Sequence, residues 1–126
     1  MRLNQVTVPA LDLERSIAFY QALGLTLIVK NSHYARFEVG DGTDTFSLHL
    51  TDDASGAANG PHIYFECKDL DARVAALKAN GIWFDSDPVD QSWLWREAWL
   101  TDPAGVKLCL YWAGEMRRFP PWRLSG

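Results

Sequence analysis

Residues 5–25, QVTVPALDLERSIAFYQALGL, and residues 62–82, HIYFECKDLDARVAALKANGI, follow one pattern. Each stretch begins with a short β-type segment, continues through an aspartate and an amphipathic segment, and ends at a glycine followed by an aliphatic residue. Asp12 and Asp69 occupy the same point of the two stretches. Because self-similarity at a fixed spacing indicates a duplicated structural unit, this comparison predicts the architecture before any single residue is interpreted.

The middle of each stretch is predicted to be a helix. Asp12 and Asp69 suit its first turn, because a carboxylate accepts hydrogen bonds from the amide groups that have no other partner there. Leu13, Ile17 and Tyr20 recur at helical spacing in the first stretch, and the second stretch has the same periodicity. The glycine that follows each segment suits the left-handed conformation in which many helices end.

β-type segments surround both predicted helices. They are expected at residues 3–8, 25–30, 34–39 and 45–51 in the first half and at residues 62–67, 82–85, 93–101 and 106–112 in the second. The predicted fold class is therefore α+β, with two tandem βαβββ modules whose sheets curve around a shared cavity. We expect a single domain, 1–126, with module one at 1–51, a linker at 52–61, module two at 62–113 and a C-terminal arm at 114–126.

Composition restricts the class of protein. The 126 residues include 12 basic and 16 acidic side chains, and the resulting net charge of −4 argues against a nucleic-acid partner. No apolar run approaches the length that spans a membrane, so no membrane partner is expected. Cys67 and Cys109, in a short chain with no apolar leader at its start, predict reduced thiols and a cytoplasmic location.

Polar side chains alternate with apolar ones along four of the predicted strands. Because successive residues of a strand point to opposite faces, each strand has an apolar face for the helices and a polar face for other contacts. Gln5, His49, His62 and Cys109 lie in the middle of the polar faces, at matching points of the repeat when His49 is aligned with Cys109. A sheet with one solvated face gives the same alternation without a function, but four donors at matching points favour a shared functional cavity.

The sequence resembles the vicinal oxygen chelate superfamily, which includes glyoxalase I, the bleomycin-resistance proteins and the extradiol dioxygenases. The resemblance rests on the βαβββ repeat, on residues 12–20 (DLERSIAFY), on residues 23–25 (LGL) and on the turn at residues 102–105 (DPAG) before a Leu-x-Leu strand. It extends from residue 1 to about residue 113. It implies a homodimer that takes a small-molecule ligand, and it does not select a reaction, because proteins of one fold carry different sites.

The resemblance also implies a metal site. Enzymes of this superfamily place metal ligands at the positions of Gln5, His49, His62 and Cys109, and the fourth of these is almost always a glutamate that serves as ligand and base. Cys109 departs from that pattern. Two imidazoles and a thiolate are good zinc ligands, and an amide carbonyl is a weak fourth. One divalent metal, with zinc the best match, and no metal at all both remain open.

A second set of residues lies on one face of the long strand predicted in the second half. It comprises Trp93, Trp95, Glu97 and Trp99. Large aromatic side chains at this spacing are typical of a core or of a subunit interface. Flat aromatic walls beside a carboxylate also suit a planar or cationic organic molecule, by stacking and by cation–π attraction. Together with Tyr64, these residues are the candidate ligand contacts.

Three functions remain open. The first is a glyoxalase-like protein that acts on or binds a small oxygenated molecule, with a metal as Lewis acid and with Glu66 or Tyr111 as catalytic acid or base. The second is a metal-free, bleomycin-resistance-type protein that sequesters an aromatic or cationic small molecule. The third is a dimeric module whose cavity has no function. The choice between the first two depends on Cys109.

Overall fold

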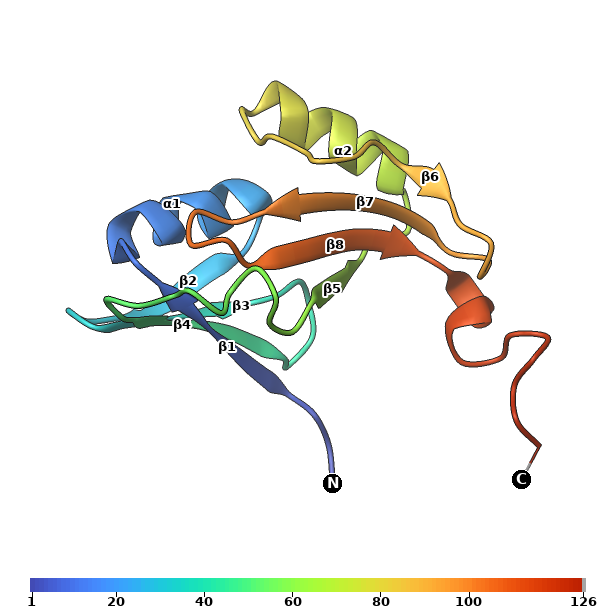
Figure 1. The fold of residues 1–126 in the computed structure, drawn as a ribbon, viewed down its shortest axis with the longest axis horizontal. Coiled ribbons are helices and arrows are strands. Elements are labelled where there is room, and N and C mark those ends of the chain that lie inside the picture. Colours follow the sequence, from blue (N-terminus) through green and yellow to red (C-terminus); the bar gives the residue numbers. More distant parts are fainter. Residues whose placement is uncertain (126) are drawn as a thin grey trace. The chain divides into compact units, whose positions relative to one another are not determined.

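The computed structural model describes residues 1–125, which form two compact units. Unit 1 consists of Met1–Pro61 together with Thr101–Lys107, and unit 2 consists of His62–Leu100 together with the described residues that follow Lys107. Each unit contains one α-helix and one of the two four-stranded mixed sheets (Figure 1). The α+β class and the two tandem modules are therefore confirmed. The turn at Thr101–Lys107 packs with unit 1, although the sequence assigns it to the second module.

Unit 1 contains the first helix and sheet. Its elements are β1 (Gln5–Ala10), α1 (Leu13–Leu23), β2 (Thr26–Lys30), β3 (Tyr34–Glu38) and β4 (Thr45–Leu50). The strand order is β1-β4-β3-β2, with β1 and β4 parallel and the other neighbours antiparallel. The four strands match the predicted ones to within two residues at every end.

Helix α1 forms where the sequence predicts it and packs across one face of the unit 1 sheet (Figure 1). Asp12 accepts a hydrogen bond from the amide of Arg15 at 3.1 Å, so its carboxylate caps the first turn. Gly24 ends the helix with φ 113°, a left-handed conformation that favours glycine. The ring of Tyr20 lies 4.6 Å from that of Phe46, and this contact helps to join the helix to the core of the unit.

Unit 2 repeats the arrangement with a more irregular edge. Its elements are β5 (Ile63–Glu66), α2 (Leu70–Ala79), β6 (Val89–Asp90), β7 (Arg96–Thr101), β8 (Lys107–Trp112) and the short 3-10 helix η1 (Gly114–Arg117). The strand order is β5-β8-β7-β6, with β5 and β8 parallel and β6 and β7 antiparallel. The predicted arm therefore begins with one helical turn before its prolines.

Two predicted strands of the second half differ from the observed ones. Residues 82–85 form no strand, and the outer strand is the two-residue β6, which follows Pro88. Proline has no N–H to donate to a ladder, which limits pairing at this edge. The long strand predicted at residues 93–101 begins only at Arg96, because the residues before it form a turn.

The two modules match in a different register from the one that the sequence predicts. Val6 of β1 pairs with Phe46 of β4, whereas Ile63 of β5, at the same point of the repeat, pairs with Leu108 of β8. The counterpart of Cys109 is therefore Ser47, and the alignment of Cys109 with His49 is wrong. A shift of two residues keeps every side chain on its face of the strand, so the polar pattern alone does not reveal it.

Candidate functional site

Five rings gather on one face of the unit 2 sheet. We call this set the aromatic wall; it comprises His62, Tyr64, Trp95, Trp99 and Tyr111. Tyr64 is central, with ring centroids 5.9 Å from Trp95, 5.7 Å from Trp99 and 5.8 Å from Tyr111, all edge to face. Trp95 stacks on Tyr111 at 4.6 Å, and His62 meets Trp99 edge-on at 5.2 Å. These are the geometries that aromatic pairs prefer.

The wall is buried at its base and open at its centre. Tyr111 is 6% exposed, Trp95 and Trp99 are half-buried, and Tyr64 is 45% exposed. The strands explain this gradient, because β8 lies between β5 and β7 and its side chains are covered from both sides. The predicted ligand contacts Tyr64, Trp95 and Trp99 are thus brought together on one surface of unit 2.

Glu97 is the carboxylate of this region, and it is 4% exposed. Its two oxygens accept hydrogen bonds from the indole N–H groups of Trp93, at 2.7 Å, and of Trp99, at 3.0 Å. Trp93 lies in the turn before β7 rather than in the strand, yet it reaches the same carboxylate. The predicted group of Trp93, Trp95, Glu97 and Trp99 therefore meets, but its carboxylate is held inside the protein.

Cys109 lies beneath the wall. Its side chain is 0% exposed, and the rings of Trp95 and Trp99 pack against the cluster that contains it. Burial, and after it the charge of Glu97, raises the pKa of the Cys109 thiol to about 12. Cys109 lies on the predicted polar face of its strand but is not open to solvent, because the neighbouring tryptophan rings cover it.

The two candidate catalytic residues lie on neighbouring strands. Glu66 and Tyr111 are directly opposite one another in the β5–β8 ladder, and Glu66 is exposed. Burial is the main cause that raises the pKa of Tyr111, so its hydroxyl is protonated at neutral pH and suited to donate a hydrogen bond. Their roles as acid and base stay a prediction.

The predicted metal ligands of unit 1 are separated along its ladder. Gln5 pairs with Thr45, whose hydroxyl donates to the Gln5 side-chain oxygen at 2.8 Å, while His49 pairs with Pro9 near the other end of β1. In residues 1–125, neither unit contains a group of three or more His, Cys, Asp or Glu side chains arranged to hold a metal ion.

The predicted metal ligands of unit 2 differ in their surroundings. His62 is exposed and packs against Trp99, whereas Cys109 is buried under the rings of Trp95 and Trp99. In unit 1, the amide oxygen of Gln5 already accepts a hydrogen bond from Thr45. The metal site stays a prediction.

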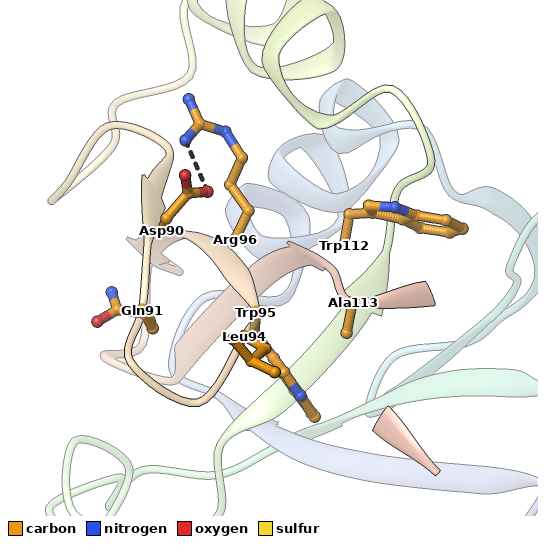
Figure 2. A pocket seen from close by; sticks show the side chains of 7 residues that line it. All are labelled: Asp90, Gln91, Leu94, Trp95, Arg96, Trp112 and Ala113. Carbon is orange, nitrogen blue, oxygen red and sulfur yellow. Dashed lines mark hydrogen bonds and ion pairs between the residues drawn. The ribbon is translucent and has the colours of Figure 1, made fainter. Parts of the chain in front are cut away.

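A groove of 470 Å³ in unit 2 shares Trp95 with the aromatic wall and is shown in Figure 2. Its lining residues are Asp90, Gln91, Leu94, Trp95, Arg96, Trp112 and Ala113. Arg96 donates a hydrogen bond to Asp90 at 3.0 Å. It also donates one hydrogen bond to each carboxylate oxygen of Asp71, at 2.8 and 2.9 Å. Because two acids neutralise this guanidinium, Arg96 ties α2 to β7 and β6 and does not offer a free charge to a ligand.

Two polar residues of unit 1, Tyr34 and Arg36, were not among the predicted site residues. Tyr34 and Arg36 of β3 lie on the face of the sheet that also carries Ser47 and His49 of β4. The alternation of Tyr34 and Arg36 with the buried Ala35 and Phe37 is the sequence signal that could have revealed them.

Comparison with known proteins identifies the family. A sequence model of the Glyoxalase/Bleomycin resistance protein/Dioxygenase superfamily matches residues 2–110, which is most of the chain. No curated protein of described function matches it.

In residues 1–125, no helix is both long enough and apolar enough to cross a membrane.

Solved structures of this superfamily share the fold. A glyoxalase/bleomycin resistance protein/dioxygenase from Nocardioides is 24% identical with a TM-score of 0.77, over 99% of this chain and 90% of that one. A bleomycin-binding protein complexed with bleomycin is 21% identical with a TM-score of 0.74, over 90% and 99%. A bleomycin resistance determinant encoded on the transposon Tn5 is 22% identical with a TM-score of 0.74, over 89% and 98%. On the sequence match and the shared architecture, this chain belongs to the glyoxalase/bleomycin resistance protein/dioxygenase superfamily.

Proposed function

We propose that the protein binds and sequesters a planar aromatic or cationic small molecule on the aromatic wall, without converting it. The observation that carries this proposal is the exposed ring of Tyr64, set among the edges and faces of Trp95, Trp99 and Tyr111. A flat ligand gains stacking energy on such a surface, and a positive charge adds cation–π attraction.

The buried charge beside the wall supports the preference for a cation. The charge of Glu97 contributes, after burial and the Cys109 thiol, to the raised pKa of Tyr64, so the carboxylate acts electrostatically on the wall. Its oxygens remain engaged by Trp93 and Trp99. A cationic ligand would therefore be attracted through the rings without displacing those hydrogen bonds.

The protonation states of the wall support binding over turnover. General acid–base catalysis works best with a group whose pKa lies near the operating pH. Burial raises the pKa values of Tyr64 and Tyr111, and it is the main cause of the raised pKa of Cys109. All three groups are therefore protonated at neutral pH, and none is an activated base or nucleophile.

The solved relatives supply supporting context. One neighbour is described as a bleomycin-binding protein complexed with bleomycin, so this fold can hold a large organic ligand. At 21% identity the likeness concerns the fold, and the ligand of this chain is proposed from its own residues. The glyoxalase-like, metal-dependent function expected from the sequence stays a prediction.

We also propose that the protein is a homodimer in the cytoplasm, as the sequence predicts. Large apolar side chains remain exposed in unit 2, among them Trp93 at 45%, Phe119 at 51% and Trp122 at 57%. Exposed aromatic residues of this kind are typical of surfaces that meet a partner.

Fluorescence quenching tests the proposed ligand class. We expect the planar cation proflavine to quench tryptophan emission saturably, and Tyr64→Ala to weaken its binding about five- to tenfold, which corresponds to about 1–1.4 kcal/mol. Tyr64 is the best residue to change because it is exposed and its removal leaves the buried rings in place.

The matched control is Trp83→Phe. Trp83 is 81% exposed and is not one of the wall residues, so its replacement should leave the affinity unchanged. Equal affinity of Tyr64→Ala and the wild type, or no saturable quenching by proflavine or by bleomycin, would overturn the proposal.

A further inference from the structure

Four polar side chains form a compact group on one face of the unit 1 sheet. We call it the polar block; it comprises Tyr34 and Arg36 of β3 and Ser47 and His49 of β4. Tyr34 is directly opposite His49 in the ladder, and Arg36 is directly opposite Ser47. Side chains opposite one another in an antiparallel pair have Cβ atoms about 5 Å apart, so the four groups meet over a small area.

Hydrogen bonds hold the block in one arrangement. Arg36 donates through Nε to the hydroxyl oxygen of Tyr34 at 2.9 Å, and its guanidinium carbon lies 5.3 Å from the centre of the Tyr34 ring. The Tyr34 hydroxyl is also hydrogen-bonded to the hydroxyl of Ser47 at 2.6 Å. Ser47 is 0% exposed, so the anchor of this chain of contacts is buried.

The positive charge of the block is not neutralised within the described chain. Ion pairs in residues 1–125 involve the cations Lys30, Lys78 and Arg96, and no carboxylate lies within 4.0 Å of the Arg36 guanidinium. Arg36 is half-buried, with its Nε engaged by Tyr34. Its two Nη groups make no hydrogen bond to residues 1–125, although a guanidinium favours a bidentate oxyanion partner.

We infer that the polar block is a binding subsite for the oxyanion of a small molecule, either a carboxylate or a phosphate. The Nη groups of Arg36 would take two of its oxygens, and the imidazole of His49 is placed to donate to the same group. The subsite lies wholly in unit 1 and uses no residue of the aromatic wall. A test of this subsite is therefore independent of a test of the proposed function.

The ionisation of Tyr34 provides a local reporter. Burial raises the pKa of Tyr34, but the hydrogen bonds from Ser47 and Arg36, together with the Arg36 charge, outweigh it and lower the pKa below its usual value of 10.0. The other titratable groups on this face are His49 and Glu38. An anion seated on Arg36 would offset its charge and return the Tyr34 pKa upward.

Calorimetric titration of the full chain with inorganic phosphate and with acetate tests the inference. Ionic strength is held constant with chloride. We expect saturable binding of at least one anion, and the preferred anion identifies which group the natural ligand carries. Arg36→Gln should weaken this binding at least tenfold, whereas Arg15→Gln, which removes an exposed arginine of α1, should leave it unchanged.

Two further measurements keep the inference testable if Arg36→Gln does not fold. Arg36→Lys keeps the charge but loses the guanidinium fork, so it should bind the preferred anion several-fold more weakly than the wild type. In the wild type, the preferred anion should raise the pH at which the most acidic tyrosine absorbs as tyrosinate, and Tyr34→Phe should abolish that transition. Absence of saturable binding by both anions, or equal affinity of the wild type and the Arg36 variants, would overturn the inference.

Discussion

Asp102 shows how one residue of the DPAG turn organises its surroundings. It is 4% exposed, and its carboxylate accepts hydrogen bonds from the Tyr20 hydroxyl at 2.5 Å and from the amides of Ala104 and Val106 at 2.8 and 2.9 Å. A buried carboxylate is tolerated when it has several donors. This bond from α1 to the turn explains why residues 101–107 pack with unit 1.

Tyr20→Phe should therefore destabilise the protein. The ring remains and keeps its packing on Phe46, but Asp102 loses one donor while it stays buried, at a cost of about 1–3 kcal/mol. Urea unfolding at neutral pH measures the loss. The matched control is Tyr64→Phe, because the exposed Tyr64 hydroxyl donates no hydrogen bond to residues 1–125, and a similar loss in both variants would contradict this account.

Cys109 should make the stability of the protein fall at alkaline pH. The thiol pKa is raised from 9.0 to about 12 in the folded state, so the unfolded chain loses this proton first. The stabilisation is complete below about pH 9 and declines above it, by up to about 1.4 kcal/mol per pH unit.

Unfolding measured between about pH 8 and pH 10, in the range where an ordinary thiol ionises, tests this expectation. Cys109→Val replaces the thiol by an apolar group of similar size and should flatten the decline. The thiol pKa of Cys67 is also raised, and this residue contributes a smaller part of the alkaline loss of stability. Cys67→Val should therefore retain most of that loss. An unchanged slope in Cys109→Val would show that the buried thiol is not its source.

At the scale of elements, the hairpin between β6 and β7 differs most from its prediction. The amide of Gln91 donates to the carbonyl of Trp95 at 2.7 Å, which closes a three-residue loop. Leu94 ends that loop with φ 70°, the left-handed conformation that such loops place before the second strand. The alternating tryptophans predict an extended strand here, and no glycine or asparagine marks the turn. The turn places the indole N–H of Trp93 within hydrogen-bond distance of Glu97, whose other oxygen accepts from Trp99 of the wall.

Leu94→Gly should stabilise the protein by about 0.5–1 kcal/mol. Glycine removes the steric cost of the left-handed conformation, and its greater freedom in the unfolded chain offsets part of that gain. Thermal unfolding detects the change. Ser92→Gly is the control in the same loop and should lower stability, because Ser92 has no positive φ to relieve. A destabilised Leu94→Gly would mean that the Leu94 side chain contributes more than its conformation costs.

At the scale of the whole molecule, metal content and subunit number are linked to the proposed function. Native mass spectrometry of the purified protein measures both at once. We expect the mass of two chains without a metal, and no gain of mass when zinc is added. Stoichiometric zinc that is lost in His62→Ala and Cys109→Ala would instead favour the metal-dependent alternative, and a single-chain mass would contradict the dimer.

The sequence by itself determined the duplicated βαβββ architecture and the superfamily. These depend on spacing along the chain: the recurrence of Asp12 and Asp69, the helical periodicity after each and the DPAG turn are all local. It also assigned each strand residue to a face, because alternation has a period of two.

Only the tertiary structure decided which of those residues meet. A two-residue shift leaves the faces unchanged, so the pattern could not show that Ser47, not His49, corresponds to Cys109. The burial of Cys109 and the engagement of Glu97 depend on tryptophan rings that pack from neighbouring strands and a turn. The pairing of Arg36 with Tyr34 and Ser47 likewise depends on the register of β3 and β4. Burial and register are set by contacts between distant segments, and it is these contacts that give each polar residue its chemistry.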